Sequence, residues 1–462
     1  MKKCIFLIII IVFGIHSLQA QHDCDCNEAL EKLVTLIERD YPGLEEKTRD
    51  KHLYSSFKKE LISKADTTGK EECLTILKSY ISFFRDGHIA FLSNQSSIKV
   101  EKTFVKTTLP SFRKTIAKTT DTLEGIWVND QMKIGIIKQD SIYKGFMIAA
   151  ANSDRKQHEV IFTLDKREHF QYIFSNQTTF DGAYSVIKDT LLLNRLGYGF
   201  IKDNQEVLDT NFLKVKTWEL EGFYIKKLTP RTAIFKIKSF NYPYIRRIDE
   251  LVSLNRDLIE NIENLIIDIT DNGGGTDITY GPLLPYILTN NTRHTGNEFY
   301  STEFLIKGLQ DYVAKLDNNE TNQKDIQRIN NNINYLKQHL REFVVYPDEQ
   351  RLMITERKLA VKSPKQILIL TNKRSASSAE SFLLTVRQSK KVKVMGIPTF
   401  GALDYASARI TDYNCLGLSM ILPTYRSTRL PDFPIDNIGV QPDIYVDQTQ
   451  DLLSVALEYL EQ

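Results

Sequence analysis

Between residues 24 and 92, apolar residues recur at intervals of three or four positions. This spacing predicts amphipathic helices, because such positions fall on one face of a helix. The second apolar group stops at Arg85-Asp86-Gly87, a sequence typical of a helix end. We therefore expect a helical N-terminal segment over residues 21–99. Its apolar sets are Leu30, Leu33, Val34 and Ile37, then Cys73, Leu74, Leu77, Tyr80, Ile81 and Phe84.

Residues 100–218 follow a shorter period. Runs such as EGIWV, MKIGII, YKGFMI and EVIFTL alternate apolar with polar positions and are separated by turn residues. Alternation of this kind predicts antiparallel strands with one buried face. We expect a barrel-like antiparallel β module. The glycine pair in NRLGYGFI leaves a divergent PDZ domain as the alternative.

From residue 219 to 462 the pattern becomes that of an α/β domain. NLIIDIT and QILIL are continuously apolar, as strands buried on both faces are. An amphipathic helix is predicted over 245–262, and ESFLLTVRQS reads as another helix. Apolar residues at helical spacing also predict a helical insertion at 309–343. This insertion could be a lid, a contact surface or plain packing.

The first twenty residues differ from the rest of the chain. Lys2 and Lys3 precede the apolar run CIFLIIIIVFGI, which is followed by SLQA. A basic start, a short apolar centre and small residues at the exit are typical of a secretory signal peptide. An uncleaved membrane anchor is the alternative. We expect an exported protein, periplasmic or secreted, without stable membrane insertion after signal removal.

The charge balance argues against two kinds of partner. The whole chain carries a formal charge of +2, and removal of residues 1–20 takes away two lysines and no acidic residue. The mature chain is therefore formally neutral. Nucleic acids and anionic membranes attract basic proteins, so neither is an expected partner.

Four cysteines follow the signal peptide, in a compartment that we expect to be oxidising. Cys26 begins one helical pattern and Cys73 lies in another, so a disulfide could join the two helices. Cys24 is a rival for Cys73, and the state of Cys415 stays open. No histidine stands at ligand spacing from the Cys-Asp-Cys sequence, which argues against a metal site.

Two strand ends carry candidate chemistry. Gly273-Gly274-Gly275 follows one predicted strand, and backbone N–H groups in such a loop can face an oxyanion. The serines Ser375, Ser377 and Ser378 follow another strand and directly precede a helix. A serine in that turn exposes its Oγ beside the helix N-terminus. A simple turn and a simple helix cap are the alternatives.

Four ordered motifs resemble one family. RSASSAE, KVKVMGIPTFG, LIIDITDNGGG and IDNIGVQPDIYV are similar to motifs of the C-terminal processing (tail-specific) serine peptidases and their tricorn-core relatives. The resemblance covers about residues 220–462, and FRDGHIAF is a further match outside that range. It implies a ClpP/crotonase-like α/β core that hydrolyses peptide bonds through an acyl-enzyme, with no metal or organic cofactor. Peptides or proteins would be the substrates.

The resemblance assigns the nucleophile and its oxyanion donors. The family's serine motif lies on residues 375–380, which makes Ser377 the nucleophile. Ser378 would then supply one oxyanion N–H, and the glycine triplet, through Gly274, the other. Ser375 would be a turn residue.

The position of the base departs from the tail-specific pattern. That branch uses a lysine where this chain has Ala402, and alanine cannot accept a proton. The tricorn-like arrangement instead implies His88 as the base, since imidazole titrates near neutral pH. Asp436 matches the position of that family's acid, while Asp86 is a competing residue to orient His88. Gly87 replaces the serine that links acid to histidine.

Two other functions are compatible with the same motifs. The scaffold could carry a non-catalytic protein that binds hydrophobic ligands, with the β module as the ligand holder. A hydrolase of small esters could use the same residues. A fluorophosphonate would label Ser377 in a hydrolase and leave a binding protein unlabelled.

Overall fold

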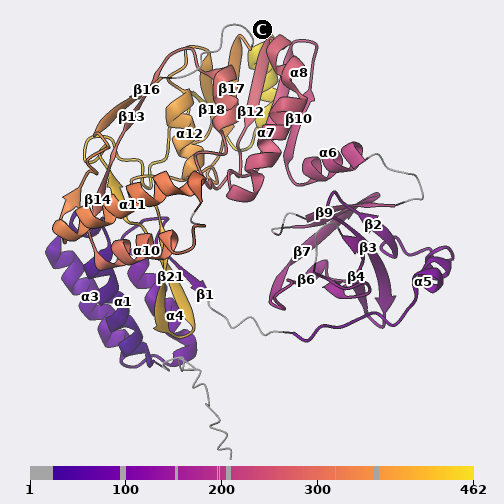
Figure 1. Cartoon of the computed structure of the whole chain (residues 1–462), viewed down its shortest axis with the longest axis horizontal. Helices are drawn as coiled ribbons and strands as arrows, with labels where there is room; N and C mark the ends of the chain where they lie inside the picture. Colours follow the sequence, from indigo (N-terminus) through magenta and orange to yellow (C-terminus); the bar gives the residue numbers. More distant parts are fainter. Residues whose placement is uncertain are drawn as a thin grey trace, which may run out of the picture.

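The structure is a computed structural model that describes residues 24–93, 100–150, 154–194, 196, 198–203, 210–317, 319–356 and 364–462. The predicted signal peptide lies outside these ranges. Figure 1 shows three parts: N-terminal helices at one end of an α/β core, and a β-barrel beside that core. Over the described ranges, no helix combines the length and apolar character needed to cross a bilayer.

The N-terminal segment is helical, as its apolar spacing predicted. Helix α1 packs against both α3 and α4, and Asp25 and Asp50 cap the first and third helices by accepting hydrogen bonds from backbone N–H groups. The elements are α1 (Cys26–Asp40), α2 (Leu44–Lys47), α3 (Lys51–Ala65), α4 (Lys70–Ser82) and the short strand β1 (Ala90–Ser93).

This segment shares its hydrophobic core with distant sequence. Apolar side chains of α1 and α4 lie in one buried cluster with Met420 and Leu422 of the hairpin β20 (Arg409–Cys415) and β21 (Leu418–Leu422). Strand β1 also pairs antiparallel with β21, with Ala90 opposite Ile421. The N-terminal helices therefore share a hydrophobic core with the C-terminal part of the chain.

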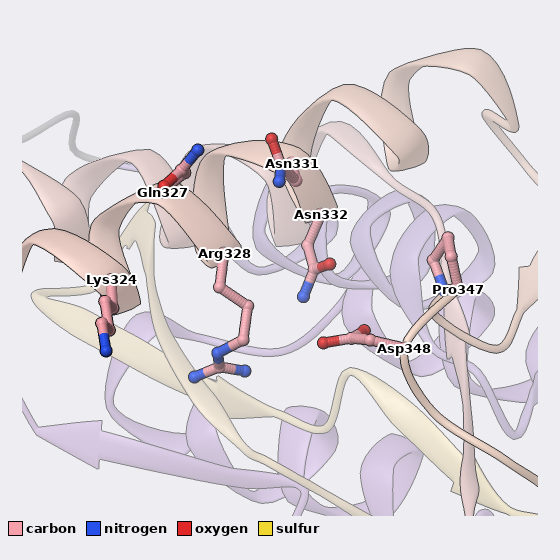
Figure 2. Close-up of a pocket in the computed structure, with 7 residues that line it drawn as sticks. All are labelled: Lys324, Gln327, Arg328, Asn331, Asn332, Pro347 and Asp348. Atoms are coloured by element: carbon pink, nitrogen blue, oxygen red, sulfur yellow. The ribbon is translucent and has the colours of Figure 1, made fainter.

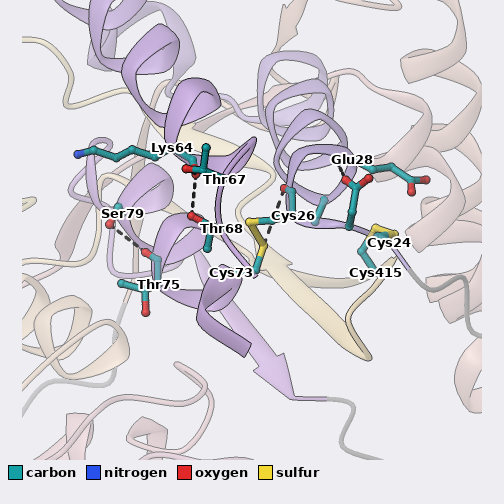
Figure 3. The surroundings of a disulfide bond; sticks show 12 residues. Cys24, Cys26, Glu28, Lys64, Thr67, Thr68, Cys73, Thr75, Ser79 and Cys415 are labelled. Atoms are coloured by element: carbon teal, nitrogen blue, oxygen red, sulfur yellow. Dashed lines mark hydrogen bonds between the residues drawn. A yellow bond between two sulfur atoms is a disulfide. The ribbon is translucent and has the colours of Figure 1, made fainter. Parts of the chain in front are cut away.

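Two disulfides lie at the start of α1 (Figure 3). One joins Cys26 to Cys73 of α4, with Cα atoms 5.4 Å apart. The other joins Cys24 to Cys415 at the end of β20, with Cα atoms 5.5 Å apart. The start of the described sequence is thus linked covalently both to α4 and to the end of β20.

The β module is a closed antiparallel barrel of consecutive strands. Strand β2 pairs with β9, which closes the sheet. The divergent PDZ domain is therefore wrong as a description of this module. Gly199 of its glycine pair instead lets a helix approach, since a Cβ there would lie 3.1 Å from Leu220 Cβ. The elements are α5 (Leu109–Ile116), β2 (Gly125–Val128), β3 (Met132–Gln139), β4 (Ile142–Ala150), β5 (Val160–Leu164), β6 (His169–Ile173), β7 (Thr179–Ile187), β8 (Thr190–Leu193) and β9 (Tyr198–Lys202).

Large side chains fill much of the barrel. Trp127, Phe162, Phe170 and Phe200 are fully buried and belong to one cluster. Eight strands enclose just enough room for side chains or one small ligand. The alternating residues of this sequence therefore lie on the two faces of the barrel wall, which carries many apolar side chains.

The α/β core is built on a six-stranded sheet, which confirms the predicted fold class. Its order is β10-β11-β12-β17-β18-β23, and every neighbouring pair except β10–β11 is parallel. The elements are α6 (Thr210–Leu220), β10 (Phe223–Lys227), β11 (Thr232–Ile237), η1 (Tyr242–Tyr244), α7 (Ile245–Leu254), α8 (Arg256–Asn261), β12 (Asn264–Asp268), β17 (Gln366–Thr371), α12 (Ser378–Val386), β18 (Val392–Gly396), β23 (Ile444–Tyr445) and α13 (Leu452–Glu461).

Helices cover both faces of this sheet. Alternate residues of β12, such as Leu265 and Ile267, face α7, α8 and α12, whereas Ile266 between them faces α13. The helix predicted over 245–262 is interrupted at Asn255, whose side-chain amide donates to the Leu251 carbonyl at 2.9 Å. A side chain that binds the last carbonyls in this way competes with helix continuation.

The remaining elements surround the carboxyl end of the sheet. Helices α10 and α11 form the predicted insertion and begin before residue 309. The insertion contacts the N-terminal helices, because Arg341 donates to the Arg39 carbonyl at 2.6 Å. These elements are η2 (Gly281–Leu283), α9 (Leu284–Ile287), β13 (Thr292–Thr295), β14 (Asn297–Tyr300), α10 (Glu303–Val313), α11 (Glu320–Gln338), β15 (Phe343–Val344), β16 (Leu352–Thr355), β19 (Tyr405–Ala406) and β22 (Tyr425–Ser427).

Candidate active site

Ser377 occupies a strained turn between strand β17 and helix α12. It is the N-cap residue of α12 and has φ 56° and ψ −118°, a region that residues with a side chain rarely adopt. Ser375 is different: it is fully buried, and its Oγ donates to the Ile269 carbonyl at 2.9 Å. Ser375 therefore holds the turn, while Ser377 presents its hydroxyl at the helix N-terminus.

The buried carboxylate of Glu380 holds this turn in place. One of its oxygens accepts from the backbone N–H groups of Ser377 and Ala402, both at 2.9 Å. The other accepts from Gly401 N at 2.7 Å and from Thr399 Oγ1 at 2.5 Å. Four donors thus converge on one carboxylate and fix the nucleophile turn against the loop 399–402.

His88 reaches the same place from the segment between α4 and β1. Its Nε2 lies 3.3 Å from Ser377 Oγ, within hydrogen-bond distance. The imidazole is largely buried, and burial lowers the pKa of His88 below its ordinary value. His88 lies just before β1, and the pairing of β1 with β21 holds this segment against the core. Residues far apart in sequence therefore form a serine–histidine pair.

The position where tail-specific relatives are expected to have lysine holds only a methyl group. Ala402 is buried, and it packs against the turn that carries His88. A Cβ on Gly87 would lie 3.2 Å from Ala402 Cβ and 2.6 Å from Phe400 Cε1. The absence of a side chain at residue 87 thus lets the loop 399–402 approach the histidine segment closely.

Neither candidate acid forms a hydrogen bond to the imidazole. Asp86 accepts from His88 N at 2.8 Å and from Tyr41 Oη at 2.9 Å, while its Oδ1 lies 3.9 Å from His88 Nδ1. Asp86 therefore braces the backbone of His88. Burial and the nearby Asp436 carboxylate raise the pKa of Asp86 above its ordinary value.

Asp436 is held by other donors. Its Oδ1 accepts from the backbone N–H groups of Leu403 and Asp404, at 3.1 and 2.9 Å, and its Oδ2 lies 3.3 Å from Lys47 Nζ. Burial raises the pKa of Asp436, and Lys47 opposes this shift. The carboxylate acts on His88 through its charge, which raises the pKa of His88 and partly offsets the effect of burial.

The second imidazole nitrogen has an incomplete set of partners. Nδ1 of His88 is buried, and among the described residues no acceptor meets it with ordinary hydrogen-bond geometry. The nearby backbone of Tyr405 raises the pKa of His88. The sequence did not suggest this effect.

The glycine triplet lies directly beside Ser377. Gly274 has φ +93°, and a Cβ there would lie 2.7 Å from the Ala376 carbonyl oxygen and 2.8 Å from Ser378 N. Its own N–H donates to Asn272 Oδ1 at 3.0 Å. For Ser378 N–H, in contrast, the described part of the chain offers no acceptor. Of the two candidate oxyanion donors, Ser378 N–H is therefore free, and Gly274 N–H is engaged by an asparagine side chain.

The comparison with protein-family models agrees with this geometry. Residues 231–446 match the model described as peptidase family S41. The chain is a serine-type peptidase, and this part of it is similar to family S41. Its substrates are peptides or proteins, as the family implies. The matched range includes Ser377 and the glycine triplet, whereas His88 precedes it.

A search of solved structures found several matches of low sequence identity. Mature CPAF complexed with lactacystin is 14% identical to this chain, with a TM-score of 0.48 and coverage of 94% of this chain and 97% of that one. The photosystem II D1 C-terminal processing protease is 11% identical (TM-score 0.36, coverage 92% and 94%). The tricorn protease is 11% identical (TM-score 0.37, coverage 95% and 37%). A search of curated proteins found no match.

A separate polar cavity of about 320 Å³ lies on the insertion of this peptidase. Figure 2 shows Arg328 and Asn332 of α11 on one side and Asp348 on the other, directed toward one another. This cavity shares no residue with the serine–histidine site. Among the described residues, no group of three or more His, Cys, Asp or Glu side chains could hold a metal ion.

Sequence reasoning missed two residues that shape the site. Glu380 stands three residues after the N-cap, the position at which a glutamate binds back to the cap N–H, so a capping-box pattern could have indicated it. Lys47 lies in the short helix α2 and reaches Asp436 only through tertiary packing. Its sequence surroundings carry no signal for that contact.

Proposed function

We propose that this peptidase is an exported enzyme that cleaves peptide bonds with Ser377 as nucleophile and His88 as general base. The separation of 3.3 Å between His88 Nε2 and Ser377 Oγ is the observation that carries the proposal. The absence of a proton-accepting group at Ala402 supports histidine over lysine. A lysine base would have to come from elsewhere in the chain.

The proposed reaction proceeds in two steps. Ser377 Oγ attacks the peptide carbonyl carbon while its proton passes to His88 Nε2. The resulting oxyanion accepts a hydrogen bond from Ser378 N–H, and from Gly274 N–H once that group leaves Asn272. The C–N bond then breaks as His88 returns the proton to the leaving amine. Water, activated by the same imidazole, hydrolyses the acyl-enzyme and restores the serine.

Burial suits His88 to this task. A general base must be unprotonated, and burial lowers the pKa of His88 from its ordinary value near 6.5. The neutral imidazole therefore predominates at neutral pH. Asp436 would favour the imidazolium that forms in the transition state through its charge, and Asp86 would position the histidine backbone. We expect kcat/KM to rise with pH through an apparent pKa below 6.5 and then to level off.

Labelling with a fluorophosphonate tests the proposal. Wild-type protein should be labelled, with the adduct on Ser377 in a peptide map. Ser377→Ala should not be labelled, and His88→Ala should be labelled at least 100-fold more slowly with an unchanged melting temperature. His169→Ala, an exposed barrel histidine, is the matched control and should behave as wild type.

Three results would redirect the proposal. An unlabelled wild-type protein would favour the non-catalytic ligand-binding function. Labelling without cleavage of any member of a peptide library would favour a small-ester hydrolase. A large fall in melting temperature with His88→Ala would indicate a packing role for that histidine.

Separate observations support export of the protein, and a separate experiment tests it. The basic and apolar N-terminal segment and the two disulfides favour a secretory route. N-terminal sequencing of the protein recovered outside the cytoplasm should begin at Gln21. A chain that retains Met1 and reduced cysteines in the cytoplasm would contradict export.

A further inference from the structure

A second cavity adjoins the serine–histidine site. Its volume is about 740 Å³, and Ser381 and Leu384 of α12 are among its lining residues. These residues stand four and seven positions after Ser377, so all three fall on one face of the helix. The cavity therefore begins about one helical turn, roughly 5–6 Å, from the nucleophile.

Two other lining residues, Leu403 and Ile278, also follow segments of the active site along the chain. Leu403 follows Ala402, whose N–H binds Glu380, and its own N–H binds Asp436. Ile278 lies shortly after the glycine triplet. A peptide whose carbonyl lies between Ser377 and that triplet would therefore place a neighbouring side chain at the mouth of this cavity.

The cavity walls combine apolar and polar side chains. Leu284, Met353, Leu384, Leu403 and Tyr425 contribute apolar surface, whereas polar residues that include Arg293, His294 and Asn297 line the rest. A cavity of several hundred Å³ that offers both apolar surface and polar groups is typical of a ligand site.

The polar groups at the wall are largely engaged with one another. Ser381 Oγ donates to Asp277 Oδ2 at 2.7 Å and lies 3.3 Å from Tyr280 Oη. The buried guanidinium of Arg429 lies 3.1 Å from Asp404 Oδ1 and donates to the Leu403 carbonyl at 2.9 Å. The charge of Arg429 is thus used to hold the protein together and is not available to an acidic ligand.

Two large apolar side chains are exposed at the rim. Ile278 is 65% exposed and Phe433 is 57% exposed, although both line the cavity. Exposed apolar side chains grouped at the mouth of a cavity mark a binding surface more often than a plain protein surface. They would be covered when a ligand occupies the cavity.

From these features we infer that the cavity is a specificity pocket for a large apolar side chain, of the leucine, methionine or phenylalanine class, next to the cleaved bond. The inference rests on the proposed function and names the substrate class of that site. Ile278 and Phe433 would close over the bound side chain and exclude water from it.

The test uses a peptide library and three matched variants. Wild-type enzyme should cut next to large apolar residues and rarely next to glycine. Ile278→Glu and Phe433→Glu should each lower kcat/KM for a preferred peptide at least tenfold, while the rate of fluorophosphonate labelling stays within twofold of wild type. The control is Ile354→Glu, which alters an isoleucine of nearly equal exposure, 63%. Ile354 lies between the cavity residues Met353 and Thr355 on β16 but does not line the cavity, so its variant should cleave as wild type does.

The outcomes separate the two proposals. An unlabelled wild-type enzyme would overturn the proposed function itself. Labelling of the wild type together with cleavage that ignores side-chain size would overturn the specificity pocket alone, as would an equal loss of activity in all three variants. Melting temperatures identify a variant that fails to fold. In that case Ile278→Ala, which removes apolar contact without adding charge, should show a smaller loss of kcat/KM for the preferred peptide.

Discussion

The strained backbone at Ser377 leads to an unusual prediction about stability. Replacement of Ser377 by alanine removes the hydroxyl but keeps a Cβ at φ 56°. Replacement by glycine removes the hydroxyl and the Cβ together. The difference in free energy of unfolding between these two variants therefore isolates the cost of the backbone conformation.

The expected size follows from two opposing effects. A residue with a side chain held in such a region costs about 1–3 kcal/mol. Glycine relieves that cost but loses more conformational freedom on folding, which costs about 0.4–1 kcal/mol. We expect Ser377→Gly to be more stable than Ser377→Ala by about 1 kcal/mol. Both variants should lack activity.

Urea unfolding followed by far-UV circular dichroism measures this difference. Fluorescence is less suitable, because Trp127 lies in the barrel and Trp218 at its junction with the core, and these are the only two tryptophans. The matched control is the same pair of substitutions at Ser381, which lies inside helix α12. There glycine should be less stable than alanine by about 1 kcal/mol.

The reversal of sign between the two positions is the decisive result. If Ser377→Gly is equal to or less stable than Ser377→Ala, the backbone at Ser377 is not strained, and the reasoning is refuted. If glycine stabilises both positions, the effect does not come from the local backbone.

Three further predictions concern the surroundings of the site. Glu380→Gln leaves one acceptor oxygen for four donors, so the free energy of unfolding should fall by about 2–4 kcal/mol in urea; a loss below 1 kcal/mol would contradict the clamp. Because burial raises the pKa of Asp86, the folded state binds its proton more tightly, and wild-type stability should fall as pH rises from about 4 through that raised pKa. Asp86→Asn, which can still pair with Tyr41, should lack this fall; parallel pH profiles of both proteins would refute it. The double variant Cys24→Ser/Cys415→Ser should lose about 2–5 kcal/mol under oxidising conditions, and an unchanged urea midpoint would show that the disulfide does not form.

Local patterns were sufficient to predict the main elements. The alternation in EGIWV and MKIGII became strands β2 and β3, and the continuous apolar runs became the central strands β12 and β17. These patterns succeed because burial on one or both faces imposes its own period on the sequence. The break at Asn255 was missed, because it depends on one side chain that binds a carbonyl within its own helix.

Long-range contacts were harder to predict. Cys415 stands 391 residues from Cys24, and no local spacing relates them. The expected acid–histidine link also depended on tertiary detail, since both Asp86 and Asp436 accept hydrogen bonds from other groups. The closeness of His88 to Ser377 could be anticipated only because motif resemblance carries long-range information that composition and periodicity do not.

The order of the two reactive residues along the chain has a consequence for the cell that makes the protein. His88 and Ser377 are separated by 289 positions, with the whole barrel between them. At roughly 5–20 residues per second, a ribosome would take about 15–60 seconds to pass from one to the other. In the proposed mechanism, every chain that ends within that interval would lack the nucleophile. Such fragments would therefore be unable to hydrolyse peptide bonds.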